Sequence, residues 1–234
     1  MSLNFGGAAT DRMACGTDTS LENLDPVTIV GWIRPETQPS VITTIVWQKG
    51  VSFPNAQFVQ LVGSSGRFGL LSQRSANSCA VTATYGNYAA WGTNKWLFFA
   101  CQTDTTNVAN CRSFVGDAST LAAQPSSYAV QQVGSGTVFN NAGAVAYMGN
   151  KSTFDVPFDG DIAFLGIWDR ILSTGEINDQ QFFPHKTSGC VYFNYPGFAG
   201  NGTQPDWSGN SANNGSVTGA TVSTGAPIAM PFNM

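Results

Sequence analysis

Two aspartates in the second half of the chain have the spacing that acid–base chemistry would need. Asp159 and Asp161 are separated by one residue, and on a regular strand two such side chains share a face. Hydrolysis of a glycosidic bond commonly uses two carboxyl groups that flank the bond. Gly160 lies between the two aspartates and favours a turn, and the glutamates are scattered: Glu22, Glu36 and Glu176. We therefore do not expect this pair to be catalytic.

Other catalytic groups are sparse. His185 is the single histidine, and it follows Pro184 in a predicted loop. A serine or cysteine nucleophile needs a base, and no Gly-x-Ser-x-Gly motif occurs. The sequence also has no His/Cys spacing typical of zinc sites and no phosphate-binding loop. We expect no enzyme activity.

Calcium is the candidate cofactor. Asp155, Asp159 and Asp161, with Asn150 nearby, place several oxygen atoms in one loop-rich segment. Calcium binds carboxylate, amide and carbonyl oxygens of this kind. The alternative is a solvated acidic loop that holds no metal, and the sequence leaves both open.

Aromatic side chains near turn residues are candidates for sugar binding, because a ring can stack on a sugar while amides bond to its hydroxyl groups. Tyr85, Tyr88 and Trp91 flank a Gly-Asn turn signal. Trp207 stands among amides and a carboxylate, namely Asp206, Asn210, Asn213 and Asn214. The alternatives are that two of the first three rings pack into the core and that Trp207 anchors a loop.

The five cysteines lack metal-ligand spacing, and buried free thiols are the simplest interpretation. One disulfide is a further hypothesis. Cys101 and Cys111 are symmetric about Thr106, so a hairpin that turned there would place them opposite each other.

Composition limits the remaining classes of function. The chain has 234 residues, of which 42% are hydrophobic and only 10% charged, with a net charge of −4. No basic field exists to hold phosphates, so we expect no nucleic-acid binding. No window holds the roughly 18 apolar residues of a membrane span, so we expect no membrane insertion. The first seven residues also lack the features of a signal peptide.

The elements that must position these residues are mostly strands. Runs rich in β-branched and aromatic residues, separated by Gly, Asn and Pro, predict strands at 27–33, 41–47, 58–62, 68–72, 96–103, 111–115, 145–149 and 162–168. Ser173 and Glu176 form a capping box that predicts a short helix near 174–181. Trp32, Trp96 and Trp168 lie within strand runs, and we expect them to pack in the core.

Four stretches, in order along the chain, resemble the laminin-G-like family of concanavalin A-like jelly rolls. They are residues 2–5 with 25–35, 94–100, 146–150 with 158–163, and 167–177. The last stretch, which runs from Ile167-Trp168-Asp169-Arg170 into the capping box, is the closest match. The resemblance covers residues 2–182. It implies an all-β jelly-roll β-sandwich of two antiparallel sheets with one short helix.

We expect one domain over residues 1–234, with residues 186–234 as a C-terminal extension packed on the sandwich. Part of that extension, around Asp206-Trp207, resembles a segment that more usually precedes such a domain. Its C-terminal position is similar to phage and phage-like bacterial proteins of the family. This resemblance also fits the missing signal peptide.

These observations predict a non-enzymatic virion structural protein at the virion surface, either a capsid decoration protein or a tail-associated protein. Its partners would be capsid or tail proteins, copies of itself and host glycans. The alternative is a secreted or cell-surface carbohydrate-binding module, located outside the cell. A glycosidase is a third hypothesis, kept only because related folds host such enzymes.

Overall fold

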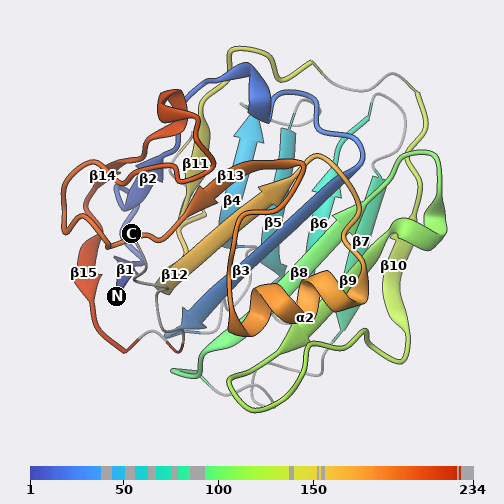
Figure 1. Ribbon diagram of the computed structural model, residues 1–234, viewed down its shortest axis with the longest axis horizontal. Helices are drawn as coiled ribbons and strands as arrows, with labels where there is room; N and C mark the ends of the chain where they lie inside the picture. The colour runs from blue at the N-terminus through green and yellow to red at the C-terminus, as the bar shows by residue number, and fades with distance from the viewer. Residues whose placement is uncertain are drawn as a thin grey trace.

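The computed structural model describes residues 1–37, 44–50, 56–62, 67–74, 79–84, 93–136, 140–151, 153, 156–225 and 227, without the side chains of 62, 67, 79 and 81–84. Two antiparallel sheets lie face to face, and one helix packs on the outside of the first sheet (Figure 1). The predicted all-β sandwich with one short helix is therefore confirmed. No helix in these described ranges is long and apolar enough to cross a membrane.

The first sheet has seven strands in the order β15-β1-β12-β3-β8-β9, with β13 also paired to β12. Its strands are β1 (Ser2–Gly6), β3 (Val27–Pro35), β8 (Leu97–Thr103), β9 (Arg112–Gly116), β12 (Asp159–Trp168), β13 (Cys190–Asn194) and β15 (Thr221–Ser223). The two long central strands, β3 and β12, pair along almost their whole length.

The second sheet has eight strands in the order β10-β7-β6-β5-β4-β11-β2-β14. Its strands are β2 (Arg12–Ala14), β4 (Thr44–Gly50), β5 (Ala56–Val62), β6 (Arg67–Ser72), β7 (Cys79–Thr84), β10 (Tyr128–Gln132), β11 (Ala146–Met148) and β14 (Ser216–Thr218). Three 3₁₀ turns complete the described elements: η1 (Thr19–Leu21), η2 (Val108–Asn110) and η3 (Ser211–Asn213).

Two hydrophobic cores explain why β3 is apolar on both faces. One core fills the space between the sheets and includes Trp47 and Phe99. The other lies between the first sheet and helix α2 (Thr174–Phe182), and it includes Trp32 and Trp168. Burying both faces of a strand favours a continuous apolar run. The core positions predicted for Trp32 and Trp168 are confirmed, whereas Trp96 is half-buried.

Helix α2 begins at the predicted capping box. The Ser173 hydroxyl accepts from the backbone N–H of Glu176, and the Glu176 carboxylate accepts from the backbone N–H of Ser173. Arg170 also binds this carboxylate, with Nη2 2.6 Å from Oε1. Because the Arg170 guanidinium is hydrogen-bonded to it, the pKa of Glu176 falls to about 2.

Acid is therefore expected to weaken the start of α2. The pKa of Glu176 is lower in the folded chain than in the unfolded chain, so its contribution is complete above pH 4.5 and is lost as the pH falls toward 2. Urea unfolding of the wild type and of Glu176→Gln should show a less stable variant near neutral pH. Near pH 2 the two proteins should converge, and a difference that does not change with pH would contradict this assignment.

The C-terminal extension supplies strands to both sheets. β13 pairs with β12, β15 pairs with β1, and β14 pairs with β2 in the second sheet. Its loops also bond to the N-terminal half, because Asn210 Nδ2 donates to Asp18 Oδ1 at 2.5 Å and Asn213 Nδ2 to Ser20 Oγ at 3.1 Å. These contacts join residues that are about 190 positions apart in the sequence.

The predicted disulfide between Cys101 and Cys111 is wrong, because both residues are free cysteines. In the β8–β9 pair the partner of Cys101 is Ser113, so the hairpin is centred on Asn107 and not on Thr106. The turn η2 then leaves Cys111 just before β9, where its Sγ lies 3.5 Å from the carbonyl oxygen of Asp104.

Thiol titration checks this correction. In denaturant without reductant we expect at least four free thiols, from Cys15, Cys101, Cys111 and Cys190. In the native protein Cys15 and Cys101 should react slowly, because burial removes access and raises the pKa of each thiol to about 12. Fewer than four free thiols in denaturant would instead support a disulfide between Cys101 and Cys111.

Candidate functional site

The two aspartates with catalytic spacing have different partners. Asp161 is fully buried and accepts from Arg34 Nε at 2.6 Å and from Ser2 Oγ at 3.4 Å. Asp159 is half-buried, and its Oδ2 accepts from Thr37 Oγ1 at 2.6 Å. Asp161 is thus neutralised by an ion pair inside the protein, whereas Asp159 faces the rim of the sandwich.

Gly160 lies within β12 and not in the expected turn. Its φ is +143°, and a Cβ added there would lie 2.2 Å from the carbonyl oxygen of Arg34. Glycine is therefore required here because the backbone of β3 passes too close for a side chain. This close approach aligns β12 with β3 and fixes the Arg34–Asp161 pair.

The structure describes only part of the predicted calcium site. Asp155 lies outside the described residues, and Asp161 is occupied by Arg34. Within the described part of the chain, no three His, Cys, Asp or Glu side chains converge as metal ligands. His185 is exposed, and its Nδ1 lies 2.7 Å from the carbonyl oxygen of Phe183.

Trp207 is 40% exposed and packs edge-on against Phe198, with ring centres 5.4 Å apart. Its expected polar neighbours are used within the fold. The Asp206 carboxylate accepts from the backbone N–H groups of Phe193 and Ser208. Asn210, Asn213 and Asn214 likewise bond to protein groups. The other three aromatic candidates, Tyr85, Tyr88 and Trp91, lie outside the described residues.

One side chain from each strand of the second sheet forms a continuous row. Directly paired residues of antiparallel strands point to the same face of a sheet. The pairs from β14 to β10 connect Ser216, Ala14, Tyr147, Gln48, Phe58, Leu71, Ala80 and Gln132. We call these eight side chains the outer row. Their strand neighbours Trp47, Val59 and Leu70 point into the core, so the row lies on the face away from the first sheet.

The outer row combines apolar rings with amides. Phe58, Leu71 and Tyr147 are half-buried and remain in contact with solvent. Gln48, between Phe58 and Tyr147, is 3% exposed, and its Oε1 has no hydrogen-bond partner within the described ranges. The Arg12 guanidinium lies 4.5 Å from the centre of the Tyr147 ring and is the one charged side chain that the structure describes on this face.

The sequence contained only a weak signal for this row. Along β5, residues Gln57, Val59 and Leu61 face inward, and Phe58 and Gln60 face outward. Apolar residues thus occur at both inward-facing and outward-facing positions of β5. The alternation of apolar and polar residues that is typical of a half-exposed strand is therefore absent. Tyr147, flanked by two buried residues, shows the alternation but over only three positions.

The similarities to known proteins concern the fold. No protein-family model matches the sequence, and no curated protein sequence matches it. The SAP-like pentraxin of Limulus polyphemus superposes with a TM-score of 0.57 at 11% identity, over 95% of this chain and 94% of that chain. The chain has the concanavalin A-like jelly-roll fold.

A second solved structure shares this jelly roll. A putative carbohydrate binding protein of Bacteroides ovatus has a TM-score of 0.58 at 14% identity, over 98% of this chain. This chain spans 61% of that protein. Domains LG4-5 of the mouse laminin alpha1 chain give a TM-score of 0.48 at 10% identity, over 74% of this chain and 43% of that chain. The phage resemblance stays a prediction from the sequence.

Proposed function

We propose that this protein is a carbohydrate-binding module without catalytic activity, and that an oligosaccharide lies along the outer row. The observation that carries the proposal is the strip of half-buried Phe58, Leu71 and Tyr147, which crosses a sheet face with little charge. Sugar rings present apolar C–H faces to such side chains while their hydroxyl groups bond to nearby amides. Gln60 is half-buried and occurs two residues after Phe58 in β5, on the same face of the sheet. Its amide could form a hydrogen bond of this kind to a sugar hydroxyl group.

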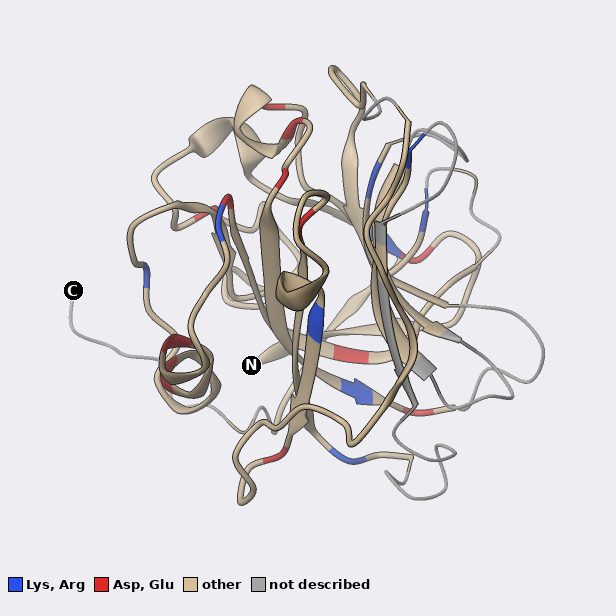
Figure 2. Cartoon of the chain, turned by 90° about the vertical axis from the view of Figure 1, so that its right-hand side faces the viewer, with Lys and Arg blue, Asp and Glu red and all other residues tan. Residues whose placement is uncertain are grey.

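The distribution of charge supports binding over acid–base chemistry. The sequence has 10 basic and 14 acidic residues. Figure 2 shows that those in the described part of the chain are scattered, with the two signs mixed. The two carboxylates with catalytic spacing have separate partners, one an ion pair and the other a threonine hydroxyl. A neutral polar surface favours contact with uncharged hydroxylated ligands.

A glycan array tests the proposed function. We expect the wild-type protein to bind a subset of oligosaccharides, and titration calorimetry should confirm each hit in solution. A flat response on a broad array, together with no binding heat in calorimetry for any candidate oligosaccharide, would rule out a carbohydrate-binding function. The same array with Trp207→Ala tests the contribution predicted for Trp207.

The predicted calcium site is a separate proposal. Asp159, with Asp155 four positions earlier in the sequence, would bind calcium from the rim. Calorimetric titration with calcium chloride should then show saturable heat that Asp159→Asn abolishes. A melting temperature that neither calcium nor a chelator changes would exclude the site.

A virion structural role remains a second proposal, which rests on the sequence of the C-terminal extension. In that case, capsid or tail proteins and further copies of the chain would be its partners, and glycan binding would serve host adhesion. Mass spectrometry of purified virions would find the protein there. Its presence in the extracellular fraction alone would instead favour a secreted or cell-surface module.

A further inference from the structure

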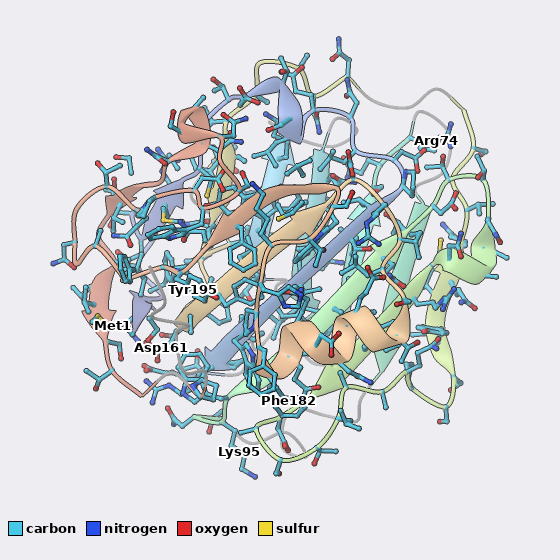
Figure 3. All side chains as sticks on the ribbon, in the orientation of Figure 1. Met1, Arg74, Lys95, Asp161, Phe182 and Tyr195 are labelled. Carbon is cyan, nitrogen blue, oxygen red and sulfur yellow. The ribbon has the colours of Figure 1, made fainter. Side chains whose placement is uncertain are left out.

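A groove that opens to solvent lies at the edge of the first sheet, where β8 begins and β9 ends. Its volume is about 500 Å³, and small-molecule sites commonly measure roughly 300–1,000 Å³. In Figure 3, Lys95 lies at the lower edge of the molecule, below the end of α2 at Phe182. We call this feature the edge groove, and its lining includes Lys95, Trp96, Val115, Asp117, Ser119 and Thr120.

One wall of the edge groove is the indole ring of Trp96. The ring is half-buried, and it packs against the core between the first sheet and α2. Arg34, on the neighbouring strand β3, has its guanidinium carbon 5.8 Å from the centre of the ring and is itself held by Asp161. These contacts fix the ring, which also lines the groove. A fixed and partly exposed aromatic ring can stack on the apolar C–H face of a sugar.

A second wall is the turn of residues 117–120, which follows β9. Asp117 Oδ1 accepts from the backbone N–H groups of Ser119 and Thr120 at 2.8 and 2.7 Å. Gln181, fully buried in α2, donates to the backbone carbonyl oxygens of Asp117 and Thr120, each at 2.7 Å. The turn is therefore ordered before any ligand arrives, which lowers the entropic cost of binding.

Asp117 also offers an acceptor to a ligand. The hydrogen bonds that its carboxylate accepts from described residues all reach Oδ1. Oδ2 accepts none from the described chain, and it is not among the buried atoms that lack a partner, so it is in contact with solvent. The backbone N–H of Ser119, which bonds to the charged form, holds the pKa of Asp117 below its usual value. The acceptor is thus an ionised carboxylate at neutral pH.

Lys95 supplies a donor at the same groove. Its side chain is exposed and forms no ion pair or hydrogen bond with another residue that the structure describes. Because Lys95 and Asp117 carry opposite charges, the groove has no net preference for a charged ligand. An aromatic ring, a carboxylate acceptor and an ammonium donor together suit a neutral ring compound that carries hydroxyl groups.

We propose that the edge groove binds one pyranose ring of a neutral sugar, at a site separate from the outer row. The sugar stacks on Trp96, Asp117 accepts from one of its hydroxyl groups, and Lys95 donates to another. The choice of a sugar as ligand rests on the proposed function. The edge groove belongs to the first sheet, whereas the outer row crosses the far face of the second.

NMR titration of the full-length protein with D-glucose, D-galactose and D-mannose in turn tests the edge groove. We expect saturable shifts at the Trp96 indole N–H and at the backbone amides of Asp117 and Ser119 with at least one monosaccharide. Asp117→Asn keeps an oxygen for the turn but replaces Oδ2 with a donor, so affinity should fall by at least about tenfold. Trp96→Phe keeps a ring against the core but reduces the stacking surface, so its affinity should also fall. This variant serves if Asp117→Asn fails to fold.

Asp169→Asn is the matched control. It removes the same charge from an exposed aspartate just after β12, at the opposite end of the first sheet from Trp96. Its affinity should equal that of the wild type. Phe58→Ala should leave the monosaccharide shifts unchanged while it weakens oligosaccharide binding along the outer row. Failure of the edge groove and failure of the proposed function are therefore distinguishable.

Two results would overturn the edge groove as a sugar site. The first is the absence of shifts at Trp96 with all three sugars, or wild-type affinity in both Asp117→Asn and Trp96→Phe. The second concerns a competing occupant: Pro227 also lines the groove, and residues 228–234 follow it in the sequence. Sugar binding by a chain that ends at Pro227, but not by the full chain, would assign the groove to that segment instead.

Discussion

Replacing Asp161 with alanine is expected to lower the free energy of unfolding by about 3–5 kcal/mol, the usual cost of breaking a buried ion pair from one side. Asp161 is fully buried in β12 and accepts from Arg34 on β3, the neighbouring strand. Without it, Glu36, at 3.1 Å, is the one remaining ion-pair partner of Arg34 among the described residues. Urea unfolding of the purified variant measures the loss.

Asp159→Ala is the control for this prediction. Asp159 occurs two positions earlier in the same strand, but it is half-buried and accepts one side-chain hydrogen bond, from Thr37. Its loss should cost about 0.5–1.5 kcal/mol. Equal losses of unfolding free energy in the two variants, or no loss for Asp161→Ala, would show that the Arg34–Asp161 ion pair does not stabilise the packing of β12 on β3.

Phe58→Ala is expected to weaken binding of any oligosaccharide identified on the array by at least about 30-fold. Phe58 is central in the outer row, and central aromatic anchors of an interface commonly contribute about 2 kcal/mol or more, which corresponds to this change in affinity. Because the ring is only half-buried, its removal should leave the fold intact. Calorimetric titration of the variant measures the effect.

Phe183→Ala provides the matched control. Phe183 is 77% exposed and follows helix α2 on the first sheet, on the opposite side of the sandwich. Its affinity should equal that of the wild type. If both phenylalanine variants bind normally, the outer row is not the glycan site. If both variants lose affinity, the loss comes from lower surface hydrophobicity in general and not from a specific site.

Local patterns in the sequence predicted much of the fold. The runs that became β3, β8, β9 and β12 are rich in β-branched and aromatic residues, and the capping box at Ser173 predicted α2 to within one residue. Strands β7 and β10 are among those that the predicted runs do not include. β7 contains two alanines and two threonines, and β10 ends in two glutamines, so neither has the apolar pattern that indicates a strand.

Pairing register lies beyond such local patterns. A shift of the hairpin centre from Thr106 to Asn107 was enough to separate Cys101 from Cys111. The outer row depends on register even more, because it joins residues from Ala14 to Ser216 through seven strand pairs. No spacing in the sequence places Phe58 beside Gln48 and Leu71. The aromatic candidates were therefore sought at turns, although the structure presents aromatic side chains on a sheet face.

The central claim, that a glycan lies along the outer row, is tested most directly by NMR mapping of an oligosaccharide that binds on the array. We predict that the largest shifts occur at Gln48, Phe58, Leu71 and Tyr147, on four adjacent strands of the second sheet. Shifts confined to the loop of Trp207, to helix α2 or to the first sheet would contradict this assignment.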